Sequence, residues 1–222
     1  MTEGQPFFRL DWVLDNLDQL ARRLGEHVLV TVIAVTAGFV ISFALALLVR
    51  RYPRIYPPIL AVSGILYAIP SIALFVLFIP ITGLSLLTAE IALVSYTLVI
   101  LVRNIVTGLR GVPAEVLEAA DGMGYSNAQR LWRVELPIAL PIIVAGVRIA
   151  TVTTIGLVTI ATLIGMGGLG YLIVNIGVTR RFPTATITGV LTVVLLSTLV
   201  DLLLLALQRH LTPWAHARAQ GE

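Results

Sequence analysis

Long apolar runs with almost no charge set the first limit on what this chain can fold into. Five of them approach or exceed the length of about 20 residues that a helix needs to cross a bilayer. They cover 28–49, 58–81, 86–109, 138–164 and 185–207. Charged residues make up only 12% of the 222 residues, whereas about a quarter of a soluble domain is charged. The sequence therefore predicts an all-α, polytopic membrane protein with five transmembrane helices.

The five runs leave little room for a soluble module. We therefore expect one membrane domain at 28–209, preceded by a segment at 1–27 and followed by a loose tail at 210–222. Within the first segment, residues 7–24 place acids on one face of a helix and leucines on the other. This pattern predicts an amphipathic helix lying in the membrane interface. A helix packed against its own bundle is the alternative.

Arginine placement predicts the orientation of the chain. Lysine is absent, and nine arginines lie in the turn at 50–54, in the region 103–133 and at the C-terminal end, at Arg209 and Arg218. Because positive residues favour the cytoplasmic side, we expect these three regions inside, and five spans then place the N-terminus outside. Arg180 and Arg181 fall on the outer side and do not follow the rule.

Two spans carry features that predict how they pack. The first repeats small residues at every fourth position, which lets another helix approach closely. These residues are Ala34, Gly38, Ser42 and Ala46. The second span holds Pro70 near its centre. A proline removes a backbone hydrogen bond, so this span should be kinked.

The loop at 111–137, between the third and fourth spans, is the main polar interruption. Glu115 suits the first turn of a helix, where a carboxylate favours the positive end of the helix dipole. Gly122 or Gly124 ends this first helix. The small side chains of Ala119 and Ala120 leave the helix bare, so that a partner protein could approach it.

A second helix is predicted in the same loop. Ser126 followed by Gln129 forms a capping box, and the helix runs over 127–135 until Pro137 stops it. The loop is therefore expected to be a helix, a glycine turn and a second helix that leads straight into the fourth span.

This loop resembles the EAA signature of ABC importer permeases. The signature residues are Glu118-Ala119-Ala120, Gly124 after three residues, and Leu136-Pro137. An ordinary surface helix–turn–helix is the alternative. The resemblance implies the type I ABC permease fold and an alternating-access transport subunit that catalyses no chemistry itself. In this family the loop forms a coupling helix that docks on a cytoplasmic ATPase subunit.

Carried over to this chain, the resemblance assigns roles, partners and a location. Glu115, Glu118, Ala119, Ala120 and Gly124 would dock on the ATPase, and Leu136-Pro137 would join the loop to the fourth span. The implied partners are two ATPase subunits that bind ATP and Mg, a second permease (identical or homologous), an extracytoplasmic substrate-binding protein and membrane lipid. Neither nucleic acid nor a cofactor in this chain is expected. The implied location is the bacterial cytoplasmic membrane.

Further motifs resemble the branch of this family that imports osmoprotectants such as glycine betaine, choline and carnitine. They include Ala68-Ile69-Pro70-Ser71, Arg103-Asn104, Leu163-Ile164-Gly165 and Gly167-Gly168-Leu169-Gly170. Permeases for methionine and other amino acids share the five-span plan and remain the alternative. No aromatic cage for a quaternary ammonium group is evident, which fits recognition by a separate binding protein.

Several residues are candidates for the translocation path. Tyr67, Pro70 and Ser71 surround the predicted kink, which has a purely structural role as its alternative. Arg148 lies eleven residues past Pro137, about 16 Å along a helix and so near mid-bilayer. A charge there should face the bundle interior or a water-filled path. It serves a structural pair, a subunit contact or the path. Asp201 and Glu90 need partners for the same reason, and the sequence does not determine the pairing.

A glycine-rich stretch follows the fourth span. Gly165, Gly167 and Gly170 satisfy the dinucleotide-binding pattern GxGxxG, but a membrane span precedes them and no acid follows at the required distance. With Gly168, they are expected to form a tight turn at the outer lip or part of an outer gate. A short surface helix is predicted at 171–178.

Other function classes fit the sequence less well. An intramembrane enzyme would need a nucleophile and base, or metal ligands, at membrane depth. The histidines stand at span ends or in the tail, at His27, His210 and His216, there is no HExxH, and cysteine is absent. A passive channel leaves the docking loop unexplained. The odd number of spans and the lack of an internal repeat disfavour an inverted-repeat transporter.

Overall fold

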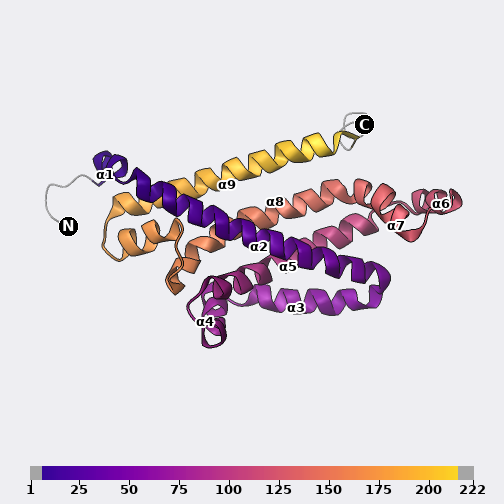
Figure 1. Cartoon of the computed structure of the whole chain (residues 1–222), viewed down its shortest axis with the longest axis horizontal. Helices are drawn as coiled ribbons and strands as arrows, with labels where there is room; N and C mark the ends of the chain where they lie inside the picture. Colours follow the sequence, from indigo (N-terminus) through magenta and orange to yellow (C-terminus); the bar gives the residue numbers. More distant parts are fainter. Residues whose placement is uncertain (1–6, 215–222) are drawn as a thin grey trace.

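The computed structural model describes residues 7–214, and this part of the chain is built from helices (Figure 1). The helices form an elongated bundle with α1 at one end and α6 at the other. The α-helices are α1 (Leu10–Asp15), α2 (Leu17–Arg51), α3 (Tyr56–Ala68), α4 (Ser71–Thr82), α5 (Leu86–Arg110), α6 (Ala114–Gly122), α7 (Asn127–Arg130), α8 (Leu136–Ala161) and α9 (Pro183–Leu211). Two π-helical segments, η2 (Leu131–Glu135) and η4 (Leu172–Val178), and two short 3-10 turns, η1 (Pro53–Ile55) and η3 (Thr162–Ile164), complete them.

Four helical stretches are long and apolar enough to cross a membrane. They are Leu17–Arg51, Leu86–Arg110, Asn127–Ile164 and Pro183–Leu211. A fifth candidate is the pair Pro53–Ala68 and Ser71–Thr82, which meet at a bend of 99°. The five apolar runs of the sequence thus correspond to four continuous helical stretches and one broken pair.

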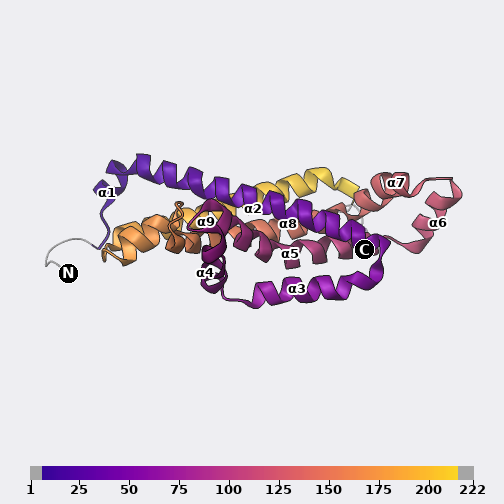
Figure 2. The same ribbon diagram turned by 60° about the horizontal axis from the view of Figure 1, so that its bottom comes forward.

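The break at Pro70 is much sharper than the kink that the sequence predicts within 58–81. Proline disfavours the helical conformation of the residue before it, and Ile69 is accordingly extended, with φ −66° and ψ 130°. The hydroxyl of Tyr96 in α5 donates a hydrogen bond to the Ile69 carbonyl, which the helix leaves free. Figure 2 shows α4 turned across the line of α3.

The N-terminal segment is two helices in place of the single helix predicted at 7–24. The helix breaks at Asn16, and α2 then runs without interruption from Leu17 to Arg51, so no boundary falls between 27 and 28. Trp12 packs edge-on against Phe182 with ring centroids 5.1 Å apart. Leu20 and Leu24 join the same cluster. Packing on the bundle, the alternative left open by the sequence, describes this segment. Most of the predicted tail at 210–222 lies outside the described residues.

α5 is the central helix of the bundle, and small residues let its neighbours approach it. The predicted stripe of α2 is buried, with Ala34, Ser42 and Ala46 at 0% exposure. A Cβ atom added at Gly38 would overlap the hydroxyl of Thr97 in α5. On the other side, a Cβ at Gly108 would lie 3.1 Å from the carbonyl oxygen of Ala139 in α8. Backbone contact of this kind is how helices associate where lipid removes the hydrophobic driving force.

The partner that the sequence leads us to expect for Glu90 is not found among the described residues. Glu90 of α5 is 9% exposed, and neither carboxyl oxygen has a hydrogen-bond partner in the described structure.

The helix predicted at 171–178 is present as η4, but it is not a surface element. Its Leu172 is 1% exposed because η4 packs against α9, which keeps Gly189 directly beside Leu172 and Ile173.

Gly146 and Gly156 of α8 provide a matched test of this packing. A Cβ at Gly146 would overlap the side chain of Asn104 in α5, whereas a Cβ at Gly156 meets nothing within 4 Å. Overpacking costs about 2 kcal/mol, or about 5 °C in Tm for a chain of this size. We expect Gly146→Ala to lower the Tm of the purified protein by about that amount and Gly156→Ala to leave it unchanged. Equal Tm values for the two variants would contradict the packing of α8 on α5.

Candidate functional site

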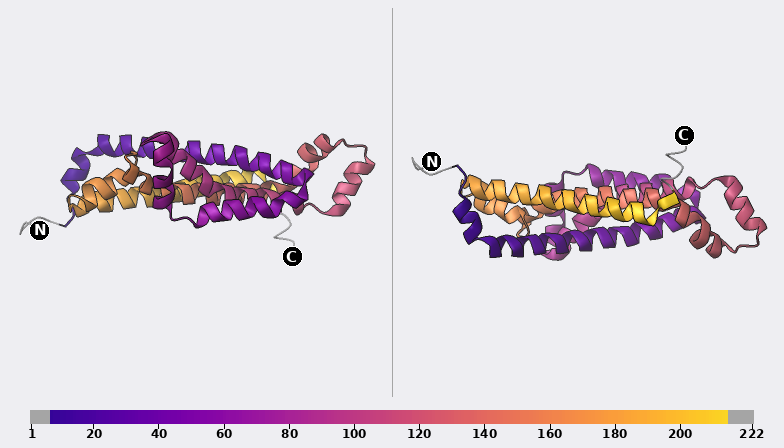
Figure 3. Two further views of the ribbon diagram at one scale, coloured as in Figure 1. Left: turned by 90° about the horizontal axis from the view of Figure 1, so that it is seen from below. Right: turned by 90° about the horizontal axis from the view of Figure 1, so that it is seen from above.

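The loop between α5 and α8 extends beyond the other helices as a hairpin of α6 and α7 (Figure 3). α6 carries Glu115 in its first turn and ends at Gly122. Gly124 has a φ of +76°, a conformation that glycine adopts without cost. The turn is closed by hydrogen bonds from the N–H of Gly124 to the Asp121 carbonyl, 3.0 Å, and from the N–H of Tyr125 to the Ala120 carbonyl, 3.1 Å. The predicted helix and glycine turn are therefore present.

Four of the five docking residues predicted on α6 and its turn are exposed. Glu115, Glu118, Ala119 and Gly124 are exposed, but Ala120 is only 1% exposed. Ala120 therefore faces the protein itself, and the expectation that its side chain is bare for a partner is wrong.

Two apolar side chains on α6 and its turn were not among the predicted site residues. Val116 is 37% exposed and Met123 is 65% exposed. They add apolar surface to a loop whose other exposed side chains are mostly polar. The sequence contains the signal, because both residues interrupt an otherwise polar stretch.

The second helix of the loop begins as predicted and ends differently. Gln129 accepts a hydrogen bond from the N–H of Ser126 at 2.8 Å, and Ser126 accepts one from the N–H of Gln129 at 3.3 Å, which completes the capping box. Pro137 does not stop the helix, because it lies in the first turn of α8, where a missing N–H costs nothing. α7, η2 and α8 instead form one continuous arm, and Leu136 and Pro137 lie half-buried within it.

A chain of ion pairs holds this arm in place. Arg130 donates to both carboxylate oxygens of Asp121, at 2.8 and 2.6 Å, and so ties α7 to α6. Its Nε also donates to Glu135 at 3.0 Å. Arg50, at the end of α2, donates Nε and Nη2 to the two oxygens of Glu135, each at 2.7 Å. The four side chains connect α6, through the arm, to the first membrane span.

Sequence reasoning did not find this network. Asp121, Arg130 and Glu135 lie within one loop, and their alternating charges were a usable signal. Arg50 is 85 positions away from Glu135, and no local pattern links the two.

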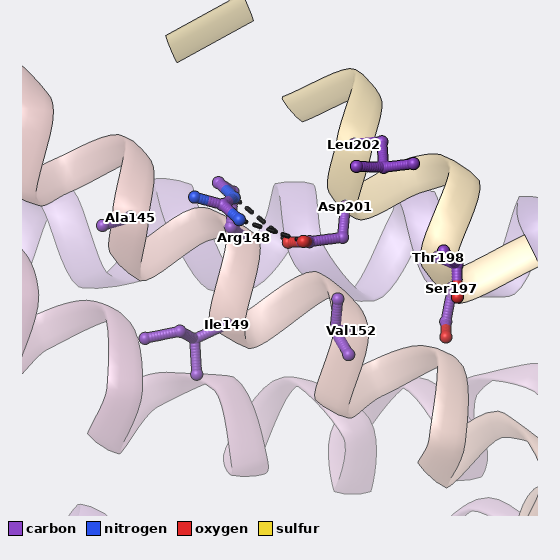
Figure 4. A pocket seen from close by; sticks show the side chains of 8 residues that line it. All are labelled: Ala145, Arg148, Ile149, Val152, Ser197, Thr198, Asp201 and Leu202. Atoms are coloured by element: carbon purple, nitrogen blue, oxygen red, sulfur yellow. Dashed lines mark hydrogen bonds and ion pairs between the residues drawn. The ribbon is translucent and has the colours of Figure 1, made fainter. Parts of the chain in front are cut away.

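Arg148 and Asp201 form the ion pair that the sequence left open (Figure 4). The Nε and Nη2 atoms of Arg148 in α8 donate to the carboxylate of Asp201 in α9 at 3.1 and 3.0 Å. Gln208 extends the pair by accepting from Arg148 Nη1 at 3.3 Å. The pair lines an open groove of about 540 Å³ between α8 and α9. The side chain of Asp201 is 36% exposed. The ion pair is therefore accessible from the groove.

The remaining path candidates lie in two other places. Tyr67, Pro70 and Ser71 stand at the break between α3 and α4, where the ring of Tyr67 meets that of Tyr96 edge-on, with centroids 5.6 Å apart. The glycine stretch follows α8 and is bound to α2. The N–H of Gly168 donates to Glu26 at 2.9 Å, and that of Leu169 to His27 Nδ1 at 3.3 Å.

Each glycine of this stretch has its own constraint. Gly165 and Gly168 have φ values of +84° and +82°. A side chain at Gly167 would overlap Glu26, and one at Gly170 would overlap the backbone of Thr159. The glycine stretch is therefore a tight turn. One hydrophobic cluster contains Leu74, near the α3–α4 break, and Ile164, next to the glycine stretch. The groove beside Arg148 is lined by other residues.

Comparisons with known proteins agree with this geometry. Residues 29–214 match the family described as the binding-protein-dependent transport system inner membrane component. The osmoprotectant import permease protein OsmW of Salmonella typhimurium (strain LT2) is 39% identical over 209 residues, which cover 92% of this chain and 97% of that protein. The choline transport system permease protein OpuBB of Bacillus subtilis (strain 168) is 35% identical over 198 residues, covering 89% of this chain and 91% of that protein.

Solved structures give the same fold. A chain of the MetNI methionine ABC transporter in an inward-facing conformation superimposes with a TM-score of 0.78 at 25% identity, covering 89% of this chain and 98% of that chain. A chain of an amino acid ABC transporter crystallised with histidines gives a TM-score of 0.77 at 18% identity, covering 91% and 98%. The resemblance drawn from the loop is confirmed, and the chain belongs to the family of binding-protein-dependent transport system inner membrane components.

Proposed function

We propose that this chain is the transmembrane permease subunit of an ATP-driven importer of osmoprotectants such as glycine betaine, choline or carnitine. The observation that carries the proposal is the exposed helix α6, held on a continuous arm beyond the end of the bundle. Such a helix is suited to transmit force from a partner into the membrane. The osmoprotectant assignment is supported by relatives that are 39% and 35% identical over most of their length.

The proposed assembly follows from the family and from the arginine distribution. The α6 end faces the cytoplasm, the N-terminus lies outside, and the chain resides in a bacterial cytoplasmic membrane. Two cytoplasmic ATPase subunits bind ATP and Mg, and one of them docks on Glu115, Glu118, Ala119 and Gly124. A second permease, identical or homologous, completes the membrane unit. An extracytoplasmic binding protein delivers the solute.

The ion pairs indicate how movement of α6 would reach the membrane. Arg130 links α6 to the arm and Glu135 links the arm to Arg50 of α2. The arm continues as α8, which carries Arg148 toward Asp201 of α9. Displacement of α6 would therefore act on α2 and α8 together and change the position of α8 relative to α9.

The translocation path is proposed to run past the residues at the broken span and beside Arg148. Tyr67, Pro70 and Ser71 at the broken span and Arg148 in its groove are the candidates for lining it. The tight turn of Gly165, Gly167, Gly168 and Gly170 at the opposite end from α6 is the candidate outer gate.

A methionine or other amino-acid permease is the second candidate function. The structural neighbours are transporters of that kind, at 25% and 18% identity. The higher identity of the osmoprotectant permeases favours the first assignment.

Uptake measurements test the substrate. Cells that lack this chain should lose uptake of labelled glycine betaine, choline or carnitine, and a plasmid copy should restore it. Uptake of labelled methionine serves as the matched control and should be unchanged. Loss of methionine uptake alone would overturn the osmoprotectant assignment and leave the permease assignment intact.

Charge reversal at Glu118 tests docking. Glu118 is exposed and makes no ion pair in the described structure, so Glu118→Lys should leave membrane level and Tm unchanged. It should abolish uptake and the co-purification of the ATPase subunit, because a lysine would face a surface built for a carboxylate. Normal uptake by this variant would remove the docking assignment.

The turn between α6 and α7 has its own matched pair. Side-chain space is open at both Gly122 and Gly124, but only Gly124 has a positive φ. An alanine at Gly124 is strained by about 1 kcal/mol, so Gly124→Ala should displace α6 and reduce ATP-dependent uptake several-fold. Gly122→Ala should behave as the unmodified protein. Equal uptake by the two variants would show that the backbone of this turn does not position α6.

A further inference from the structure

A small basic cavity lies at the α6 end of the bundle, between the last turn of α2 and the beginning of α7. Arg50, Arg51, Asn127 and Arg130 line its volume of about 380 Å³, and no carboxylate is among the lining residues. Arg51 and Asn127 are exposed, whereas Arg50 and Arg130 are only 25% and 22% exposed at their side chains. Arg51 and Asn127 therefore form the open side of the cavity, and the ion-paired Arg50 and Arg130 form its inner wall.

The arginines retain hydrogen-bond donors after their internal pairing. Arg50 uses Nε and Nη2 on Glu135, and Arg130 uses Nε on Glu135 and Nη1 on Asp121. Within residues 7–214, Arg50 Nη1 and Arg130 Nη2 have no acceptor. The guanidinium of Arg51 makes only a loose contact with the ring of Tyr52, 5.9 Å from its centroid. Three arginines against two carboxylates leave one net positive charge beside these free donors.

An apolar groove of about 480 Å³ lies between α2 and the start of α8, on the membrane side of this cavity. Its lining residues are Phe39, Phe43, Trp132, Leu136, Pro137, Leu140, Ile143 and Trp214. Arg50 follows Phe43 by seven residues, so it lies on the same face of α2 about 10 Å further along. Trp132 and Trp214 are 63% and 48% exposed. Exposed tryptophans are typical of the headgroup level of a bilayer.

We propose that the cavity of Arg50, Arg51 and Arg130 binds the phosphate of an anionic phospholipid, whose acyl chain lies in the apolar groove. Guanidinium groups bind phosphate oxygens through short, charge-assisted hydrogen bonds, and the free donors of this cavity supply them. The apolar groove beside it identifies the occupant as a lipid, because a soluble phosphate would leave that surface uncovered. The inference depends on the membrane location of the chain and is independent of the solute that it transports.

Such a lipid would act on the same residues that hold the arm. Arg50 and Arg130 already share Glu135, so a phosphate in the cavity would place a second anion against both guanidinium groups. Both arginines would then be held between two anions, and the position of the arm relative to α2 would be more tightly fixed. Anionic lipid would thus stabilise the loop that carries α6.

Arg51 provides the sharpest test, because it makes no ion pair within the described protein. The full-length protein is purified in mixed micelles that contain phosphatidylglycerol or, as the control lipid, phosphatidylcholine, and Tm and lipid affinity are measured. Arg51→Gln should bind phosphatidylglycerol about tenfold more weakly, because it loses a charge-assisted hydrogen bond to the phosphate. Arg54→Gln changes an exposed arginine outside both cavities and should bind as the unmodified protein.

Three further outcomes would overturn the proposal. If phosphatidylcholine raised the Tm as much as phosphatidylglycerol does, the site would not be selective for the net charge of the lipid. Inorganic phosphate or glycerol phosphate that produces the full shift in Tm would identify a site for soluble anions. Equal losses in Arg51→Gln and Arg54→Gln would show diffuse attraction and no defined site. In the expected result, only phosphatidylglycerol raises the Tm, and only Arg51→Gln reduces the effect.

Discussion

The α6 end of this protein depends on one buried carboxylate. Glu135 has a side-chain exposure of 6% and lies between the guanidinium groups of Arg50 and Arg130. Burying a carboxylate costs several kcal/mol unless hydrogen bonds and opposite charge offset the loss of water. Glu135 receives two hydrogen bonds from α2 and one from α7, so its burial is compensated only while both helices keep their positions. The same three bonds therefore define where the arm begins and how α6 is presented.

The membrane-spanning part is held by a different constraint. Lipid is as apolar as the side chains, so helices there associate through close backbone contact and through polar pairs. α5 is packed in the first way, through Gly38 of α2 and Gly108 facing α8. α8 and α9 are joined in the second way, by Arg148 and Asp201 beside an open groove. The bundle therefore combines a tightly interlocked centre of α2, α5 and α8 with a more open, charge-linked contact to α9.

Local signals in the sequence predicted much of this structure. The apolar runs located the spans, the capping box depends on residues three positions apart, and Gly124 adopted the positive φ that ends a helix. Features that depend on distant residues were not predictable. Arg148 and Asp201 were each expected to need a partner, but 53 positions separate them. The burial of Ala120 depends on which side of α6 faces the arm. The 99° break at Pro70 leaves the Ile69 carbonyl free, and its partner, Tyr96, comes from another helix.

The π-helical segment η2 has a consequence for how the loop is aimed. A residue added to or removed from a helix rotates everything before it by about 100° around the axis and shifts it by about 1.5 Å. η2 stands between α7 and α8, directly after Arg130. Its wider turn therefore sets the rotation of the α6–α7 hairpin about the axis of α8, and the membrane spans need not change. Two permeases with superimposable membrane bundles could thus present different sides of the same helix to their ATPases. The angular setting of this hairpin is a separate variable on which subunit compatibility can be selected.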